Sequence, residues 1–357
     1  MKEGSGRSPP ALTRLALVGL VLAVSAARWA AAEPAAPAAP PVESPLAALA
    51  SLTYQPQAAA AGKVRLVGSA TLQQAAGHWC AGFSRIHPGV ECTVASGHSD
   101  AGWKALVSGS ADIALVSRPV DDADRAAAEK ETGRRIIVVA AAFDRLVWVV
   151  NSANPVASLP WSPAGGVLER PAEPASAGDT APAAGRPRAA TTWDRLNGDA
   201  AWASVPIELH GTGLGSGTRW HMDRLLTGTG TCPLPVKEHA TIAEVAEAVA
   251  ASRGGLGLIG DTGGEWAGVK KLALVVPESA SPEDDHVAGS GRPPDCRPLF
   301  LAVALPKEGA SPAAVREFLA YVLSYSGQLD AAKDGLLPLT RGEIHAQREL
   351  LGWPVER

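Results

Sequence analysis

The sequence predicts an α/β protein with two lobes, each built on a mostly parallel sheet with helices on both faces. Short apolar strands alternate with amphipathic helices along most of the chain, which is the pattern of parallel β-α-β units. The chain has 357 residues, of which 46% are hydrophobic, enough for two separate cores. Two glycine- and hydroxyl-rich segments follow strands and open helices, where α/β proteins bind ligands.

The expected elements follow one another in a regular order. Apolar, β-branched runs predict strands at 64–67, 91–95, 112–116, 136–141, 146–150, 207–210, 256–259, 272–276 and 299–304. Apolar residues on one face predict helices at 72–86, 102–107, 125–132, 216–226, 242–252 and 313–324. Thr192-Trp193-Asp194 predicts an N-capped helix start. Phe143-Asp144-Arg145 separates two of the strands.

The N-terminus predicts export through a secretory signal peptide. Arg7 and Arg14 precede an apolar run, and Ala30-Ala31-Ala32 follow it, so that residues 1–32 have the pattern of a secretory signal peptide. The apolar run is short for a bilayer span, and its retention as an uncleaved membrane anchor is the alternative. Residues 33–62 are rich in Ala and Pro and lack hydrophobic periodicity, which predicts a linker.

Two further segments interrupt the folded sequence. Residues 162–190 are rich in Ala, Pro and Gly and predict a disordered surface insertion. Residues 278–294 predict a long polar loop.

The four cysteines fit an oxidising compartment. None lies in a C-x-x-C pair, so neither a zinc site nor a thioredoxin-type motif is indicated. Among three connectivities we favour Cys80–Cys92 and Cys232–Cys296. Free buried thiols are the alternative.

Two segments indicate anion binding. Gly68-Ser69-Ala70-Thr71-Leu72 follows the first strand, and Gly215-Ser216-Gly217-Thr218-Arg219 opens a helix. The first N–H groups of a helix lack intrahelical partners and carry its positive dipole end, so they stabilise anions. Three glycines around Ser216 and Thr218 let the backbone approach a ligand, and Arg219 adds a cation. The alternative for Thr71 is an ordinary capped turn.

Other hydroxyl residues extend this pattern. The loop from Ser96 to Gly102 contains Ser99 and joins a strand to a helix. Asp112 begins the next predicted strand, and Ser117-Arg118 follow that strand. Asp112 is a candidate buried carboxylate, although a lone Asp at this position is more often an N-cap or a surface residue.

Several function classes are excluded. The formal net charge of −4 does not suit a nucleic-acid binder. The G-x-G-x-x-G match at 255–260 follows a helix instead of a strand, so it does not indicate a dinucleotide site. Ser216 is not in a G-x-S-x-G elbow, and no H-E-x-x-H spacing or paired acid and base is present. The sequence therefore indicates a binding protein with no cofactor or metal, and not an enzyme.

Six motifs occur in the order of a known family. They are G-S-A-T-L, S-G-H-S-D-A-G, A-D-I-A-L-V-S-R, G-S-G-T-R, G-G-L-G-L-I-G and R-P-L-F-L-A-V. Over about 63–345 the chain resembles the PstS-like phosphate-binding proteins of ABC transporters, in the type II periplasmic binding protein superfamily. This resemblance implies a two-lobed Venus-flytrap fold, with lobe 1 at 63–143 and 299–345 and lobe 2 at 146–275.

The resemblance also implies a ligand set. The positions that match the family's anion contacts are Ala70, Thr71, Leu72, Ser99, Asp112, Ser216, Gly217 and Thr218. Two positions depart from the family pattern, since Thr212 and Leu214 stand where an arginine and an acidic residue are usual. In the family, buried carboxylates are thought to accept a proton from phosphate, which here leaves Asp112 for that role. Arg219, His210 and Arg118 are candidates to replace the missing arginine.

The expected function is capture of an oxyanion by an exported monomer that serves an ABC permease in the inner membrane. Inorganic phosphate is the leading ligand, with sulfate and molybdate as alternatives. A different class of function is an envelope sensing or structural module that keeps the fold but has a degenerate pocket. A secreted hydrolase ranks last because no nucleophile and base are paired.

Overall fold

The computed structural model describes residues 46–160, 169–170, 188–189, 191–197, 199–227, 234–261, 265–275, 292, 295–309 and 312–354. The predicted signal peptide, most of the predicted insertion at 162–190 and nearly all of the predicted loop at 278–294 lie outside these residues. Within the described part of the chain, no helix combines the length and the apolar character needed to cross a membrane.

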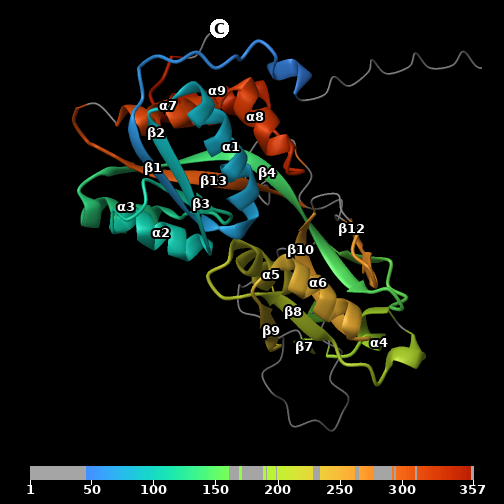
Figure 1. The fold of residues 1–357 in the computed structure, drawn as a ribbon. Helices are drawn as coiled ribbons and strands as arrows, with labels where there is room; N and C mark the ends of the chain where they lie inside the picture. Colours follow the sequence, from blue (N-terminus) through green and yellow to red (C-terminus); the bar gives the residue numbers. More distant parts are fainter. Residues whose placement is uncertain are drawn as a thin grey trace, which may run out of the picture. The chain divides into compact units, whose positions relative to one another are not determined.

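The elements of the first half lead into one long strand. They are η1 (Ala47–Leu49), β1 (Gly62–Ser69), η2 (Ala70–Leu72), α1 (Gln73–Ile86), β2 (Val90–Gly97), α2 (Ser99–Val107), β3 (Ile113–Val116), α3 (Asp122–Thr132) and β4 (Arg135–Asn151). Figure 1 shows β4 as a continuous green ribbon.

The elements that follow β4 begin with short segments and return to it through β10. They are β5 (Ser158–Pro160), β6 (Glu169–Arg170), β7 (Arg188–Ala189), α4 (Asp194–Asn197), η3 (Ala200–Trp202), β8 (Glu208–Thr212), α5 (Gly217–Thr227), β9 (Val236–His239), α6 (Ile242–Ala251), β10 (Gly255–Asp261), β11 (Val269–Lys271) and β12 (Ala273–Val275). The chain then continues through β13 (Cys296–Leu305), α7 (Ala313–Val322), α8 (Tyr325–Ala332) and α9 (Arg341–Leu350).

One mixed sheet runs through the described residues, in the order β2-β1-β3-β13-β4-β10-β8-β9. The sets β2-β1-β3 and β10-β8-β9 are parallel, whereas β13 and β4 run antiparallel to their neighbours. Our expectation of mostly parallel sheets therefore holds at the two ends of the sheet, and antiparallel strands join them.

The predicted break at Phe143-Asp144-Arg145 is wrong, because these residues continue β4. Phe143 and Asp144 pair with Pro298 and Arg297 of β13, and Arg145 lies opposite both Cys296 of β13 and Asp261 of β10. A polar pair interrupted the apolar pattern in the sequence. In the structure the partner strands supply its hydrogen bonds and a counter-charge, so the strand continues.

Two groups of hydrophobic clusters flank this strand. The first packs β1, β3, β13 and the first half of β4 against α1, α7, α8 and α9 on one face and against α2 on the other. The second packs β8, β10 and the second half of β4 against α5 on one face and α6 on the other. We call these groups of elements the first and second lobes.

The predicted linker at 33–62 is wrong for its described part. Leu49 and Leu52 are buried in the first lobe. The Tyr54 hydroxyl donates a hydrogen bond of 2.7 Å to Glu317 Oε2 and lies 2.7 Å from His87 Nε2. Leu49, Leu52 and Tyr54 anchor this segment, because the two leucines are buried in the core and Tyr54 binds the buried Glu317.

The disulfide predictions have different outcomes. The Cys80–Cys92 disulfide is confirmed and joins α1 to β2. The predicted Cys232–Cys296 bond is not, because Cys296 is a free thiol buried at the start of β13, while Cys232 lies outside the described residues. The predicted insertion contains one described antiparallel pair, β6 with β7.

Candidate functional site

Hydroxyl residues gather where three parallel strands of the first lobe end. Ser69 ends β1, Ser99 follows β2 and begins α2, and Ser117 follows β3. The Ser117 hydroxyl oxygen lies 2.7 Å from that of Ser69 and 3.3 Å from that of Ser99, and the Ser117 N–H donates to Ser99 Oγ at 3.1 Å. All three side chains are buried. The strand order places them together, since parallel strands end at the same edge.

We call Ser69, Ser99 and Ser117 the hydroxyl cluster. Arg297 lies beside it and is 1% exposed. It donates two hydrogen bonds to Asp144, from Nε to Oδ1 at 2.7 Å and from Nη2 to Oδ2 at 2.8 Å. Its Nη2 also lies 3.3 Å from Thr71 Oγ1 and 3.1 Å from Thr218 Oγ1. One guanidinium therefore joins a hydroxyl of the first lobe to a hydroxyl of the second.

The second lobe contributes the start of α5. The Ser216 hydroxyl lies 2.6 Å from Thr212 Oγ1, and the Arg219 N–H donates to Ser216 Oγ at 3.4 Å, which caps the helix. A Cβ atom on Gly217 would lie 2.2 Å from Ser117 Oγ, so only glycine allows this contact. The Asp100 N–H donates to the carbonyl of Gly215 at 3.3 Å. The start of α5 thus lies directly against the first-lobe hydroxyls.

The structure brings most of the predicted site residues together, whereas the side chains of Asp112 and Arg219 are bound to other charged residues. Thr71, Ser99, Ser216, Gly217 and Thr218 all lie at this cluster, and Ala70 and Leu72 form the short helix η2 around Thr71.

The expectation for Asp112 is corrected. Asp112 precedes β3 and lies at the amino end of that strand, whereas Ser117 lies at its carboxyl end. Arg65 binds the Asp112 carboxylate through Nε at 3.0 Å and Nη2 at 2.9 Å, and this Arg65 contact holds the Asp112 pKa below its usual range although partial burial opposes it. The carboxylate at the hydroxyl cluster is that of Asp144.

The three candidates for the missing arginine are engaged elsewhere. Arg219 binds Asp223 at 2.8 Å and Glu238 at 3.0 Å. Arg118 binds Asp100 at 2.7 Å.

His210 is also unsuited to supply positive charge. Its imidazole is buried with Nδ1 3.1 Å from His239 Nε2. Burial, followed by the neighbouring His239, lowers the pKa of His210 to about 4, so it is neutral at neutral pH. The cation at the cluster is Arg297.

Sequence reasoning missed Arg297 and Asp144 as site residues, although both stood in motifs that it had singled out. Arg297 is the arginine of R-P-L-F-L-A-V, and Asp144 is the acid of the supposed strand break. Each is a single charged residue beside an apolar strand segment. Because buried charges are stable only when they are paired, an acid and a base in two such segments indicate that the two strands lie side by side. This sequence pattern could have identified both residues.

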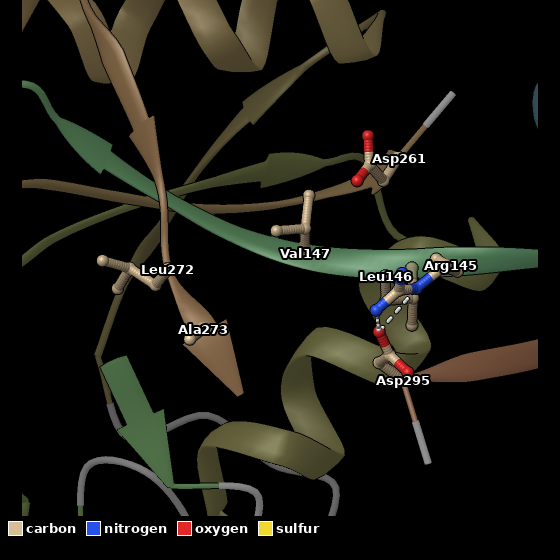
Figure 2. Close-up of a pocket in the computed structure, with 7 residues that line it drawn as sticks. All are labelled: Arg145, Leu146, Val147, Asp261, Leu272, Ala273 and Asp295. Carbon is tan, nitrogen blue, oxygen red and sulfur yellow. Dashed lines mark hydrogen bonds and ion pairs between the residues drawn. The ribbon is translucent and has the colours of Figure 1, made fainter. Parts of the chain in front are cut away.

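A separate cavity of about 90 Å³ lies next to this site, where β4 passes from one lobe to the other. Figure 2 shows its lining residues, which include Arg145, Asp261 and Asp295. Arg145 Nε binds Asp295 at 2.8 Å, and Lys271 binds Asp261 at 2.7 Å. Neighbouring residues of a strand point to opposite faces, so Arg145 faces this cavity while Asp144 faces Arg297. Each of the three charged residues that line the cavity has a partner of opposite charge, since Arg145 binds Asp295 and Asp261 binds Lys271.

Comparison with known proteins agrees with this architecture. The phosphate-binding protein PstS of Pseudomonas aeruginosa is 29% identical over 289 residues, covering 80% of this chain and 86% of that protein. Protein SphX of Synechococcus elongatus is 28% identical over 335 residues, covering 87% and 93%. The crystal structure of an ABC-type phosphate transport receptor from Vibrio cholerae has a TM-score of 0.55 at 20% identity, covering 78% of this chain and all of that one, which establishes the shared fold.

The family assignment rests on a match over most of the chain. The model of the PBP superfamily domain matches residues 53–326. This range includes β1 to β13, α1 to α7 and every residue of the hydroxyl cluster. The chain therefore belongs to the PBP superfamily.

Proposed function

We propose that this protein is an exported receptor that captures inorganic phosphate between its two lobes and delivers it to an ABC permease in the inner membrane. Two similar proteins support this ligand and this transporter. The relative from Pseudomonas aeruginosa is named a phosphate-binding protein, and the structural neighbour from Vibrio cholerae is named an ABC-type phosphate transport receptor. The protein acts as a receptor without catalysis, as a monomer in the periplasm.

The contacts of Arg297 carry the ligand assignment. Its guanidinium lies within 3.3 Å of the hydroxyls of both Thr71 and Thr218, which the sequence independently predicts as anion contacts. A guanidinium presents planar N–H donors that suit a tetrahedral oxyanion. Phosphate oxygens would accept hydrogen bonds from Arg297, from these hydroxyls and from the free N–H groups at the start of α5.

The hydroxyls suit phosphate for a second reason. Ser69, Ser99, Ser117 and Ser216 each have an oxygen that accepts as well as a hydrogen that donates. A phosphate that still carries a proton both accepts and donates, so hydroxyls satisfy all of its oxygens. Buried polar groups of a ligand are costly unless they are paired in this way.

Capture requires the two lobes to separate and close. Gly217 of the second lobe lies against Ser117 of the first, so these residues part when the ligand enters. The long strand β4 belongs to both lobes, and we propose that it bends near Asp144 and Arg145, where its pairing passes from β13 to β10. Closure then removes the anion from water, as in other hinged receptors.

Titration calorimetry of the purified protein, unfolded and refolded to remove bound anions, tests this function. We expect binding of phosphate and arsenate, no binding of chloride, and weaker binding of sulfate and molybdate. Thr71→Val and Thr218→Val remove one hydroxyl each without changing shape and are expected to weaken binding about tenfold each. Thr93→Val is the matched control, because Thr93 lies exposed on β2, and it is expected to leave affinity unchanged.

A second function is favoured by one observation. Thr212 and Leu214 occupy positions that resemble the arginine and acidic positions of phosphate receptors, and Leu214 is 68% exposed instead of facing the cluster. This fits a sensing or structural module that keeps the fold and has lost its ligand. A folded wild-type protein that binds none of the five anions would reject the receptor function and support this module.

A further inference from the structure

The long strand β4 changes its hydrogen-bonding partners on both edges where it passes from one lobe to the other. Along one edge, the pairing with β10 begins at Arg145. Along the other edge, the pairing with β13 ends at Arg145, and support from the second lobe resumes at Trp148, whose carbonyl accepts the Leu272 N–H at 2.9 Å. The hinge of β4 therefore lies between Arg145 and Trp148.

One residue of the first lobe reaches onto this hinge. Asp295 directly precedes β13, and its carbonyl accepts the Leu146 N–H at 2.7 Å. Its carboxylate Oδ2 accepts hydrogen bonds from Arg145, from Nε at 2.8 Å and also from Nη2. Leu146 is buried in the hydrophobic core of the second lobe. We call these contacts of Asp295 with Arg145 and Leu146 the Asp295 clamp, and they join the first lobe to the start of the second.

The other acid at the hinge belongs to the second lobe and has its own cation. Asp261 ends β10 directly opposite Arg145, but Lys271 of β11 binds its carboxylate at 2.7 Å. Figure 2 shows Asp261 and Asp295 on opposite sides of β4, with the Arg145 side chain directed toward Asp295. Arg145 is therefore bound to the acid of the first lobe, while Lys271 and Asp261 form a pair within the second lobe.

The cavity of about 90 Å³ gives the hinge room to move. Its lining includes Val147, which lies between the last β4 residue held by Asp295 and the first one held by Leu272. Protein interiors are normally packed without such spaces and resist deformation. The unfilled volume beside Val147 allows β4 to bend without forcing packed atoms together.

The Asp295 clamp is present while the lobes are in contact. Gly217 of the second lobe lies against Ser117 of the first in the same structure. The Arg145 side chain is 53% exposed and that of Asp295 is 12% exposed, so water can replace their contact when it breaks. An ion pair of this exposure contributes little free energy and can form and break in each cycle of opening and closing.

We propose that Arg145 is a positioning residue for closure, which acts through the Asp295 clamp to hold β4 in its closed curvature and is released when the lobes separate. This inference rests on the proposed function and assigns its hinge. The apparent dissociation constant of a ligand rises as the closed-competent fraction of the protein falls. Loss of the clamp therefore weakens phosphate binding without removing any group that touches the ligand.

Two double variants test this role, because each removes one ion pair from the lining of the same cavity. R145Q/D295N removes the ion pair of the clamp, and calorimetry is expected to show a phosphate Kd about threefold above that of the wild type. K271Q/D261N is the matched control, since both of its residues belong to the second lobe, and it is expected to bind as the wild type does. Circular dichroism establishes that each variant is folded.

Three further measurements separate a hinge role from a merely structural one. Small-angle scattering without phosphate is expected to give R145Q/D295N a larger radius of gyration than the wild type. High salt is expected to reduce the difference in affinity between the two proteins, because it screens the exposed ion pair. Arg145→Lys keeps the charge and is expected to restore wild-type affinity.

The outcomes distinguish the hinge from the receptor function. Wild-type affinity and radius of gyration in R145Q/D295N would overturn the role of Arg145 and leave the receptor function standing. An equal loss of affinity in K271Q/D261N would assign the effect to the charge of the cavity and would also overturn it. Failure of the wild type to bind phosphate would reject the receptor function, and the radius of gyration would still decide whether the clamp holds the lobes together.

Discussion

Arg297 and Asp144 lie directly opposite each other on β13 and β4 and form a bidentate ion pair, with Nε–Oδ1 and Nη2–Oδ2 distances of 2.7 Å and 2.8 Å. The pair lies one residue from Arg145, where the pairing of β4 passes to the second lobe. The ion pair therefore has a structural role and a role in the candidate site. It holds two buried charges in a sheet core, and it places a guanidinium between the hydroxyls of the two lobes.

Loss of one partner of this pair is expected to be costly for stability. Arg297→Gln leaves the Asp144 carboxylate buried without its counter-charge, which destabilises proteins by about 3–5 kcal/mol. Arg65→Gln is the matched control, because Arg65 binds Asp112 with similar geometry but is 40% exposed, and we expect a loss of about 1 kcal/mol or less. Urea unfolding measures both. Equal losses in the two variants would contradict the buried role of Arg297.

Gly217 is expected to be required for closure and not for folding. In Gly217→Ala the new methyl group would overlap Ser117 Oγ, 2.2 Å from its position, so the lobes would stay apart and phosphate affinity would fall at least about tenfold. Gly77→Ala is the control, since nothing lies within 4 Å of a Cβ there and Gly77 is on the exposed face of α1. Calorimetry and small-angle scattering with phosphate report affinity and closure. Wild-type affinity in Gly217→Ala would exclude this contact from the bound state.

His210 is expected to reduce stability at acidic pH. Burial lowers the pKa of His210 in the folded protein to about 4, from an ordinary value of 6.5. Between these values the unfolded chain binds more protons, so the free energy of unfolding falls as the pH is lowered from about 6.5 to about 4. The difference amounts to at most about 3 kcal/mol. Urea unfolding of wild type and His210→Gln across this window checks the prediction, and parallel pH profiles would refute it.

The thiol of Cys296 is expected to be unreactive in the folded protein. Burial raises the pKa of Cys296 to about 11, so its thiol is expected to resist alkylation in the native protein and to react after unfolding. Mass spectrometry of the alkylated protein locates each modification. Rapid native labelling of Cys296 would contradict its burial.

The disulfide is expected to stabilise the first lobe. Removal of Cys80–Cys92, which closes a loop with a sequence separation of 12, is expected to cost about 3 kcal/mol. Thermal unfolding of the variant C80S/C92S measures this loss. A melting temperature equal to that of the wild type would show that the bond adds no stability.

Local patterns were sufficient to predict many of the elements. Apolar runs predicted the strand of Val64–Val67 and the helix ending at Ile86, which are observed as β1 and α1. Other elements were not predicted, among them α8, where the polar Gln328 and Asp330 are buried. Gln328 donates to the carbonyl of Ala141, 187 residues away, and a partner so distant in the sequence leaves no local periodicity.

The sequence by itself determined the α/β class, the hydroxyl and glycine segments at strand ends, and the Cys80–Cys92 disulfide, because each depends on residues that are close along the chain. Only the tertiary structure decided which charges meet these segments. Asp112 and Asp144 look equivalent in the sequence, since each is a single acid beside an apolar run. In the structure Asp112 lies at the amino end of β3 and binds Arg65, whereas Asp144 lies opposite Arg297 of β13. Pairing between strands 153 residues apart is set by packing of the whole core, and local patterns do not encode it.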